Sequence, residues 1–486
     1  MVIMTKQDSV AKTNGARSSD TPAARREGDS TARRPRDTSA VGLNPIKRDA
    51  MGAAMRVLTK ITGSDLAEKY NLREPINRVT YQGTKTGFQT LGAATRTFAK
   101  VSGGGKPTRL PAGEAKNADY FDLTPTDEQQ MIVETVRDFA AEILRPAAAG
   151  ANDAAAAPAD LGKRAAELGI TLINVPEEFE GVATERGAVT NSLVAEALAH
   201  GDMGLALPLL APSGVAVALT QFGSDAQQKT YLPSFTGENV PTAAVVVTEP
   251  RALFDPFALQ TKAVRSPSGY RINGVKSFVP AAADAELFVV AAELDGRPTF
   301  FLVESDSKGL VVEADPSMGL RAAGLGRLVL TDVAVPESAI LGEADADQRA
   351  ADYADAIRLA RLGWASLAVG TGQAVLDYVI PYVNEREAFG EPISHRQAVA
   401  FMVANIAIEL DGLRLVTLRG ASRAEQGKSF AREAALARKL ATDKGMQIGL
   451  DGVQLLGGHG FTKEHPVERW YRDLRAIGVA EGIVLI

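Results

Sequence analysis

The chain has 486 residues, 45% of them hydrophobic and 23% charged, which is the composition of a globular protein with room for two or three domains. Its formal net charge of -6 gives no electrostatic reason to expect nucleic acid or an anionic membrane as a partner. The absence of cysteine excludes disulfides, a thiolate nucleophile and a cysteine metal site, and it fits a reducing, cytoplasmic location. The four histidines stand at no metal-ligand spacing, and we find no uninterrupted apolar stretch long enough to span a bilayer.

The first part of the chain has the composition of a disordered tail. Residues 1–45 are rich in Ser, Thr, Ala, Gly, Asp and Arg and have almost no apolar periodicity. Their arginines suggest a transit peptide or a tail that binds an anionic surface, but the acidic residues between them weaken both alternatives. Residues 46–118 carry short helical patterns broken by glycine-rich turns. We expect an irregular, partly helical arm that lies on the main body or on a partner chain.

A helical domain is expected over residues 119–240. Thr124 followed by Pro125, with Asp127 three residues after the threonine, predicts a helix cap. Apolar residues then recur at helical spacing as far as Ile143.

The pattern changes to short β-rich runs over residues 241–345. Six runs separated by Gly, Pro and Asp turns predict a small antiparallel β-domain: AAVVVTEP, YRINGVKSFVP, LFVVAAEL, TFFLVES, LVVEA and RLVLTDVAVP. Long Ala- and Leu-rich segments over residues 346–486 predict a helical bundle. The predicted fold class is therefore α+β, in the order helices, sheet, helices.

A glycine-rich turn lies in the stretch QLLGGHGFTKEHPVERWYRD, residues 454–473. Three glycines stand between two predicted helices, the second of which is expected to begin near Pro466. Freed amides at a helix end, beside glycines that allow close approach, could cradle a phosphate or pyrophosphate. For the glycines alone, a corner between two helices with a glycine C-cap is the simpler explanation.

The whole pattern resembles the acyl-CoA dehydrogenase family. The residues at the spacings of that family's C-terminal signature are Gln454, Gly457, Gly458, Gly460, Phe461, Glu464, Arg469 and Asp473. Other landmarks occur in the family's order, so that the resemblance covers residues 121–486: VPEEFEG, FGSDAQQKTYLP, VVTEP, YRINGVKSF, LVLTDVAVP and EREAFGEPISHRQAV. It implies an N-terminal helical domain, a central β-domain and a C-terminal four-helix bundle.

The resemblance also implies FAD, bound between the β-domain and the bundle of one subunit and reaching a neighbouring subunit at its pyrophosphate and adenine ends. On the chain's own side, it assigns Thr248 to the flavin's pyrimidine edge and Phe278 to an aromatic wall. The residues that it assigns to the neighbour's FAD are Arg386, Phe389, Gln397, Gln454, Gly457 and Gly458. A guanidinium suits phosphate oxygens and glycine amides add donors without bulk, although Arg386 alone could equally pair with an adjacent glutamate.

Glu481 stands alone among apolar residues in AIGVAEGIVLI. Desolvation disfavours an ionised carboxylate and makes it a stronger base, while a frayed, solvated chain end is the alternative. The resemblance implies that Glu481 removes the α-proton of an acyl-CoA thioester as the β-hydrogen leaves as hydride to the flavin, giving the trans-2-enoyl-CoA. Its backbone amide would help to stabilise the enolate oxygen. The resemblance also places Arg361 near the acyl-CoA, although an arginine there could instead cap a helix or face solvent. It suggests an electron-transfer flavoprotein as electron acceptor in fatty acid β-oxidation, with direct oxidation by oxygen as the alternative.

Several departures fall on the side of the chain's own FAD. After VVTEP the chain reads RALFDP, so that Phe254 replaces the family's serine and Asp255 is retained. The segment 278–280 is Phe-Val-Pro instead of Trp-Ile-Thr, and five residues follow Glu481 where relatives usually continue further. We therefore weigh two hypotheses: a working enzyme in an oligomer of the family's usual kind, and a non-catalytic or half-site subunit paired with another acyl-CoA dehydrogenase chain.

Overall fold

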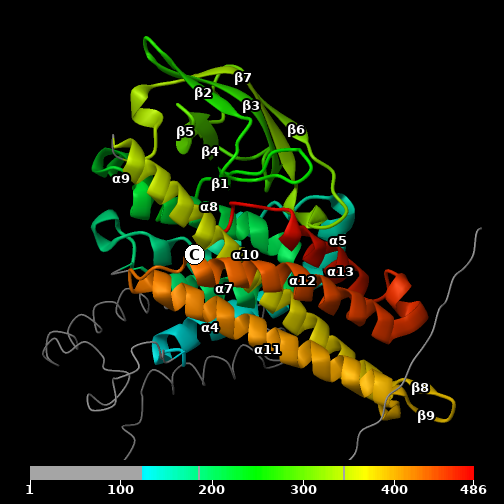
Figure 1. Ribbon diagram of the computed structural model, residues 1–486. Coiled ribbons are helices and arrows are strands. Elements are labelled where there is room, and N and C mark those ends of the chain that lie inside the picture. Colours follow the sequence, from blue (N-terminus) through cyan, green and yellow to red (C-terminus); the bar gives the residue numbers. More distant parts are fainter. Residues whose placement is uncertain (1–122, 184–185, 343–344) are drawn as a thin grey trace, which may run out of the picture. The chain divides into compact units, whose positions relative to one another are not determined.

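The computed structural model describes residues 123–183, 186–342 and 345–486. The predicted tail, 1–45, and arm, 46–118, lie outside the described residues. In the part that is described, helices come first, strands follow and helices end the chain (Figure 1). This order confirms the predicted fold class.

The first domain is helical. Its α-helices are α4 (Asp127–Phe139), α5 (Arg145–Ala154), α6 (Leu161–Leu168), α7 (Ala188–Gly201), α8 (Met203–Phe222) and α9 (Asp225–Tyr231). Its short π and 3-10 turns are η1 (Ala140–Leu144), η2 (Leu172–Asn174), η3 (Glu177–Phe179) and η4 (Leu232–Phe235). The predicted cap at Thr124 is wrong: the N-cap is Thr126, because Gln129 stands three residues later and exchanges side chain to backbone hydrogen bonds with it.

Helix α8 is the exception to our expectation of no membrane-length apolar stretch. By length and composition its 20 residues could cross a membrane, but 89% of its most apolar window is buried inside the protein. It contacts α7 on one side and the first strand of the sheet on another. The composition of α8 is therefore explained by its place in the core.

The middle domain is built on one seven-stranded sheet. Its strands are β1 (Ala243–Val246), β2 (Lys262–Ser266), β3 (Gly269–Val279), β4 (Leu287–Leu294), β5 (Arg297–Glu304), β6 (Leu310–Ala314) and β7 (Gly326–Val335), with the 3-10 turns η5 (Arg321–Ala323) and η6 (Glu337–Ala339). The order is β1-β4-β2-β3-β7-β6, and β5 pairs with β4. The six predicted strands are present. The sheet is mixed rather than purely antiparallel, because β4 runs parallel to both β1 and β2. Strand β2 was not predicted, because KAVRS is mostly exposed and carries little apolar signal.

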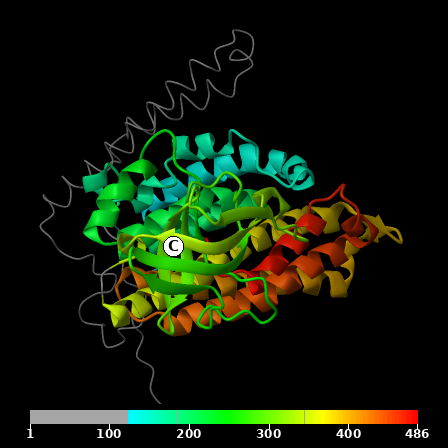
Figure 2. The same ribbon diagram turned by 90° about the horizontal axis from the view of Figure 1, so that it is seen from above.

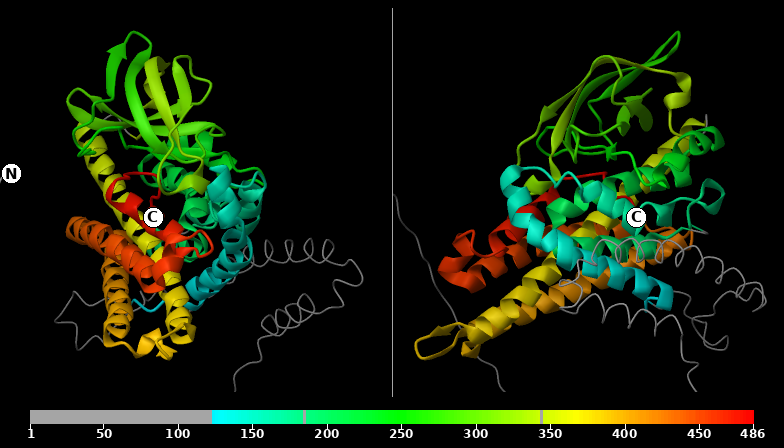
Figure 3. Two further views of the ribbon diagram at one scale, coloured as in Figure 1. Left: turned by 90° about the vertical axis from the view of Figure 1, so that its right-hand side faces the viewer. Right: turned by 180° about the vertical axis from the view of Figure 1, so that it is seen from behind.

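The last domain is a bundle around one long helix. Its helices are α10 (Ala346–Glu385), α11 (Gln397–Glu425), α12 (Ala431–Leu456) and α13 (Val467–Leu474), with the hairpin β8 (Glu387–Ala388) and β9 (Glu391–Pro392) and the turns η7 (Ile393–His395), η8 (Gly457–Phe461) and η9 (Arg475–Gly478). Helix α10 packs against α7, α11 and α12. Its 40 residues span about 60 Å, from the sheet to the β8–β9 hairpin (Figure 3). The strands lie over the helices when seen from above (Figure 2).

Candidate active site

Glu481 is buried, and its carboxylate is held by arginines from two helices. Arg361 of α10 donates from Nη2 to Oε1 at 2.9 Å and from Nε to both oxygens at 3.2 Å. Arg438 of α12 donates to the carbonyl of Ala480 at 2.8 Å, with Nη2 3.5 Å from Glu481 Oε1. The Glu481 side chain is 7% exposed. The alternative of a frayed, solvated glutamate is therefore excluded.

Thr248 holds the backbone of Glu481. The amide of Glu481 donates to Thr248 Oγ1 at 3.0 Å, and Thr248 Oγ1 donates to the carbonyl of Glu481 at 3.1 Å. Thr248 stands two residues after the end of β1 and is 4% exposed. Two groups expected to face ligands, the threonine hydroxyl and the glutamate amide, thus bond to each other in this structure.

A buried ion pair, unforeseen from the sequence, lies beside Thr248. Lys276 Nζ donates to Glu249 Oε1 and to the carbonyl of Val247, each at 3.1 Å, and the two charged side chains are 0% and 2% exposed. Burial lowers the pKa of Lys276 to about 8, against the opposing effect of Glu249. The pair joins the segment after β1 to strand β3, in which Lys276 stands two residues before Phe278. The available signal was one charge within each of two β-rich runs, VVTEP and INGVKSF.

The segment after Glu481 continues into the protein interior. Gly482 pairs with Val246 of β1, and its carbonyl accepts from Trp364 Nε1 of α10 at 2.9 Å. The amide of Ile483 donates to the carbonyl of Val245 at 3.0 Å. In Figure 1 these last residues, in red, run between the sheet and the helices.

The six residues assigned to a neighbour's FAD lie at the other end of α10. They are exposed at the end of α10, on the β8–β9 hairpin, at the start of α11 and at the end of α12: Arg386, Phe389, Gln397, Gln454, Gly457 and Gly458. The ends of α10 and α12 meet where Tyr382 Oη donates to the carbonyl of Leu456 at 3.3 Å. At about 1.5 Å per residue, Arg361 and Arg386 are about 37 Å apart along α10. The predicted residues therefore form two separate groups.

An aromatic cluster fixes the glycine turn. The hydroxyl of Tyr382 bonds to His459 Nδ1 at 2.9 Å and that of Tyr378 bonds to His465 Nδ1 at 2.7 Å. The two imidazoles stack with their centroids 5.0 Å apart. From their spacing in the sequence these histidines were expected only to be poor metal ligands, and no local pattern indicates the contacts that they make here. The turn is open at Gly457 and Gly458, where a Cβ would meet nothing within 4 Å, but packed at Gly460, where a Cβ would lie 2.2 Å from the carbonyl oxygen of Val453.

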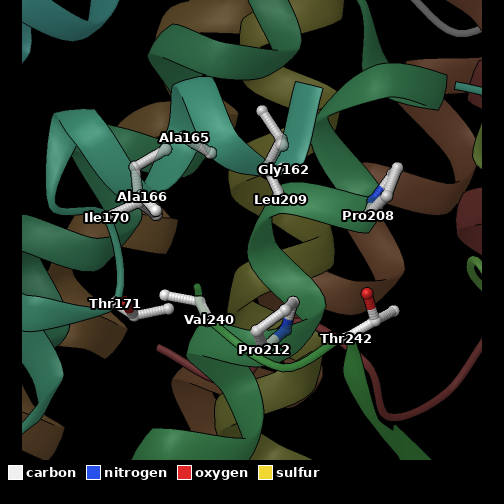
Figure 4. Close-up of a pocket in the computed structure, with 10 residues that line it drawn as sticks. All are labelled: Gly162, Ala165, Ala166, Ile170, Thr171, Pro208, Leu209, Pro212, Val240 and Thr242. Carbon is white, nitrogen blue, oxygen red and sulfur yellow. The ribbon is translucent and has the colours of Figure 1, made fainter. Parts of the chain in front are cut away.

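Two hollows in the described residues are lined by other parts of the chain. A cavity of about 40 Å³ lies between α6 and α8, beside Ala165, Pro208 and Pro212 (Figure 4), and it has room for about one water. A surface hollow of about 860 Å³ lies between η4 and the β5 end, next to Glu304. None of the predicted site residues lines either hollow.

Three family profiles match the chain in the order of its domains. They are the acyl-CoA dehydrogenase N-terminal domain over residues 126–238, the middle domain over 244–333 and the C-terminal domain over 353–483. Glu481 and Arg361 fall within the last match, and Thr248 and Phe278 fall within the middle one.

Individual relatives and solved structures agree with these profiles. Probable acyl-CoA dehydrogenase YngJ of Bacillus subtilis is 32% identical over 370 residues, which are 74% of this chain and 96% of the relative. Butyryl-CoA dehydrogenase from Megasphaera elsdenii superposes with a TM-score of 0.67 at 28% identity over 74% of this chain and 95% of that chain. A glutaryl-CoA dehydrogenase from Mycobacterium smegmatis in complex with FADH2 has a TM-score of 0.66 at 25% identity over 73% and 90%. The chain belongs to the acyl-CoA dehydrogenase family.

Proposed function

We propose that this chain catalyses the FAD-dependent α,β-dehydrogenation of an acyl-CoA thioester to the trans-2-enoyl-CoA, with Glu481 as the base. The main support for the proposal is the environment of Glu481. The residue is buried between β1, α10 and α12, its carboxylate accepts hydrogen bonds from Arg361, and its backbone amide donates to Thr248. The family's oxidoreductase activity and the FADH2 complex of one neighbour support it. FAD, when bound, supplies the redox chemistry by accepting the hydride.

The protein's own groups define the proton transfer. Glu481 Oε2 receives one bond from Arg361, at 3.2 Å, whereas Oε1 receives two, so Oε2 keeps more capacity to accept the α-proton. Arg361 fixes the direction of the carboxylate, which a general base requires. For the amide of Glu481 to donate to the enolate oxygen, its bond to Thr248 has to be exchanged or shared.

The position of the second group of residues supports a shared cofactor site. Arg386 and Gly458 are exposed and far from Glu481 along α10, so they fit the end of a FAD molecule that belongs to a neighbour. Gly458 presents open backbone, which is what close approach of a pyrophosphate needs.

An exposed apolar stripe on α11 supports an oligomer. Phe401, Ile408 and Leu415 are 59%, 67% and 56% exposed and follow each other at a spacing of seven residues. Such a row fits the face of a partner helix. We propose an oligomer of this chain, with an electron-transfer flavoprotein as acceptor and a cytoplasmic place in β-oxidation.

A flavin measurement tests the proposed function. We expect the purified chain to be yellow, with about one FAD per chain, and to lose its visible absorbance when an acyl-CoA is added. Glu481→Gln should keep the flavin and abolish the bleaching, while Glu337→Gln, at an exposed position on the β-domain, should leave both unchanged. A yellow Glu481→Gln variant that still bleaches at the original rate would exclude Glu481 as the base.

The half-site subunit is the second candidate, and the closed geometry around Glu481 favours it. The hydroxyl of Thr248 and both the amide and the carboxylate of Glu481 already have partners within the chain. Under this hypothesis the chain is colourless alone and gains flavin only when it is mixed with a second acyl-CoA dehydrogenase subunit. The same absorbance measurement therefore separates the two candidates.

A further inference from the structure

We propose that residues 483–486, with the sequence Ile-Val-Leu-Ile, occupy the apolar space beside Glu481 that the acyl chain of a substrate takes, and that this segment thereby sets which acyl groups the chain accepts. The proposal rests on the proposed function, because it takes Glu481 as the base. In this proposal, residues 483–486 compete with the acyl group of the substrate for the same space.

The segment is part of the core. Ile483, Val484, Leu485 and Ile486 are 2%, 1%, 3% and 1% exposed. Its first residue is hydrogen-bonded to β1 through the carbonyl of Val245 at 3.0 Å. Four apolar side chains with so little exposure fill space that would otherwise be a cavity next to Glu481.

Two helix glycines are matched to the segment. A Cβ on Gly214 of α8 would lie 2.2 Å from the carbonyl oxygen of Ile483, and a Cβ on Gly363 of α10 would lie 2.1 Å from that of Val484. Glycine inside a helix is less stable than alanine, so its presence at both contacts needs a packing reason. Glycines on two helices, α8 and α10, therefore allow the backbone of residues 483–484 to pack closely against both.

The reaction requires the acyl group to pass through the same region. A base has to come within about 3–3.5 Å of the atom it deprotonates, so the α-carbon of the thioester must lie beside the Glu481 carboxylate. On one side of that carboxylate are the guanidinium groups of Arg361 and Arg438. Away from these charges, the chain that follows Glu481 is apolar, and its residues 483–486 contact β1, α8 and α10. An alkyl chain gains free energy only in the apolar direction, so it has to displace the segment.

The apparent affinity equals the intrinsic affinity multiplied by the fraction of molecules in which the segment is displaced, so a segment that is rarely displaced weakens binding. A longer acyl chain needs more of the space of the four residues than a short one. Relief of the competition should therefore help long acyl groups more than short ones.

Two variants release the segment in different ways. One chain stops after Gly482, and the other is the full chain with Gly363→Ala, whose new methyl group overlaps the carbonyl of Val484. The matched control is Gly150→Ala, an exposed glycine within α5 whose Cβ would meet nothing within 4 Å. Butanoyl-CoA and octanoyl-CoA are titrated onto each flavin-loaded protein, and hydrogen exchange of the Ile483 amide is followed by mass spectrometry.

We expect both releasing variants to bind octanoyl-CoA about ten-fold or more tightly than the original chain, with a smaller gain for butanoyl-CoA and no change for Gly150→Ala. In the original chain, octanoyl-CoA should expose the Ile483 amide to exchange. Equal octanoyl-CoA affinities with a protected Ile483 amide in the complex would overturn this inference and leave the proposed function standing. If neither acyl-CoA binds any flavin-loaded variant, the proposed function falls and the inference falls with it. If Gly363→Ala does not fold, the exchange measurement on the original chain still decides.

Discussion

Replacement of Lys276 by methionine tests whether the buried ion pair stabilises the junction between β1 and β3. The ammonium group touches the Glu249 carboxylate and the carbonyl of Val247, and it is fully buried. Methionine fills a similar volume but leaves the carboxylate with the amide donors of Gln260 and Thr261 and the more distant guanidinium of Arg251, whose Nε lies 3.7 Å from Oε2. Removing one partner of a buried pair typically costs up to about 3–5 kcal/mol, because the other charge loses its nearest compensating charge.

The pH dependence of this cost has a definite sign. Burial shifts the pKa of Lys276 from 10.5 to about 8 in the folded protein. Between these two values the unfolded chain binds more protons than the folded one, so this lysine makes the free energy of unfolding increase with pH, by about 3 kcal/mol in total. The pKa of Glu249, which Lys276 and two amides hold below its usual value despite burial, adds nothing in this range. Lys276→Met should therefore appear more destabilising at pH 10 than at pH 7.

Equilibrium urea unfolding followed by circular dichroism at both pH values measures the difference. Lys262→Met is the matched control, because Lys262 pairs with Glu293 on the same sheet but is 48% exposed, and surface pairs contribute only about 0–1 kcal/mol. The double variant Lys276→Met with Glu249→Gln should recover much of the loss. The reasoning is refuted if the two methionine variants lose equal stability, or if the loss in Lys276→Met is smaller at pH 10.

Three further changes probe other parts of the structure. Burial, together with the carboxylate of Asp202, raises the pKa of Asp473 to about 7, so the folded protein holds a proton that the unfolded chain releases and loses stability as the pH rises towards 7. The Asp473→Asn variant should therefore gain more stability over the original chain at pH 8 than at pH 5, measured by thermal unfolding. An equal gain at both pH values would contradict this pKa. Ile408→Asp places a charge on the exposed stripe of α11 and should lower the molar mass seen by light scattering, whereas an unchanged mass would remove the stripe from the oligomer interface. Gly458→Ala should fold normally, because its Cβ has open space, but should retain less FAD after gel filtration, and full retention would show that the turn does not hold the cofactor.

Local patterns were sufficient for the order of helices and strands. The candidate site residues came from the resemblance to the family and stay predictions, and neither source revealed the contacts between them. Six strands were predicted because apolar and β-branched runs mark them, while β2 lacks that signal. Glu481 and Thr248 were assigned separate roles, yet their mutual bonds join residues 233 positions apart, which no periodicity can reveal. The ion pair of Lys276 was missed because a charged residue in a strand is normally expected to face solvent.

The length of α10 leads to a last prediction, about which chain completes which site. Arg361 and Arg386 sit about 37 Å apart on this one helix, so a single chain contributes to two different cofactor sites if the proposed function is correct. Glu481→Gln and Arg386→Glu should each inactivate a homo-oligomer. In a dimer of one Glu481→Gln chain and one Arg386→Glu chain, each site combines Glu481 of one chain with Arg386 of the other. One site then carries both substitutions and the other carries neither.

Co-expression of the two variants should therefore restore activity, to about a quarter of the original value for random pairing in a two-fold symmetric dimer. Each variant expressed alone supplies the baseline, and co-expression of Glu481→Gln with a differently tagged copy of itself is the matched control. If Arg386 instead served the same site as Glu481 within one chain, every site in the mixed pair would carry one lesion and no activity would return. Recovered activity would also count against the half-site subunit, because it requires that Glu481 of this chain does chemistry at a site completed by a second copy of the same chain.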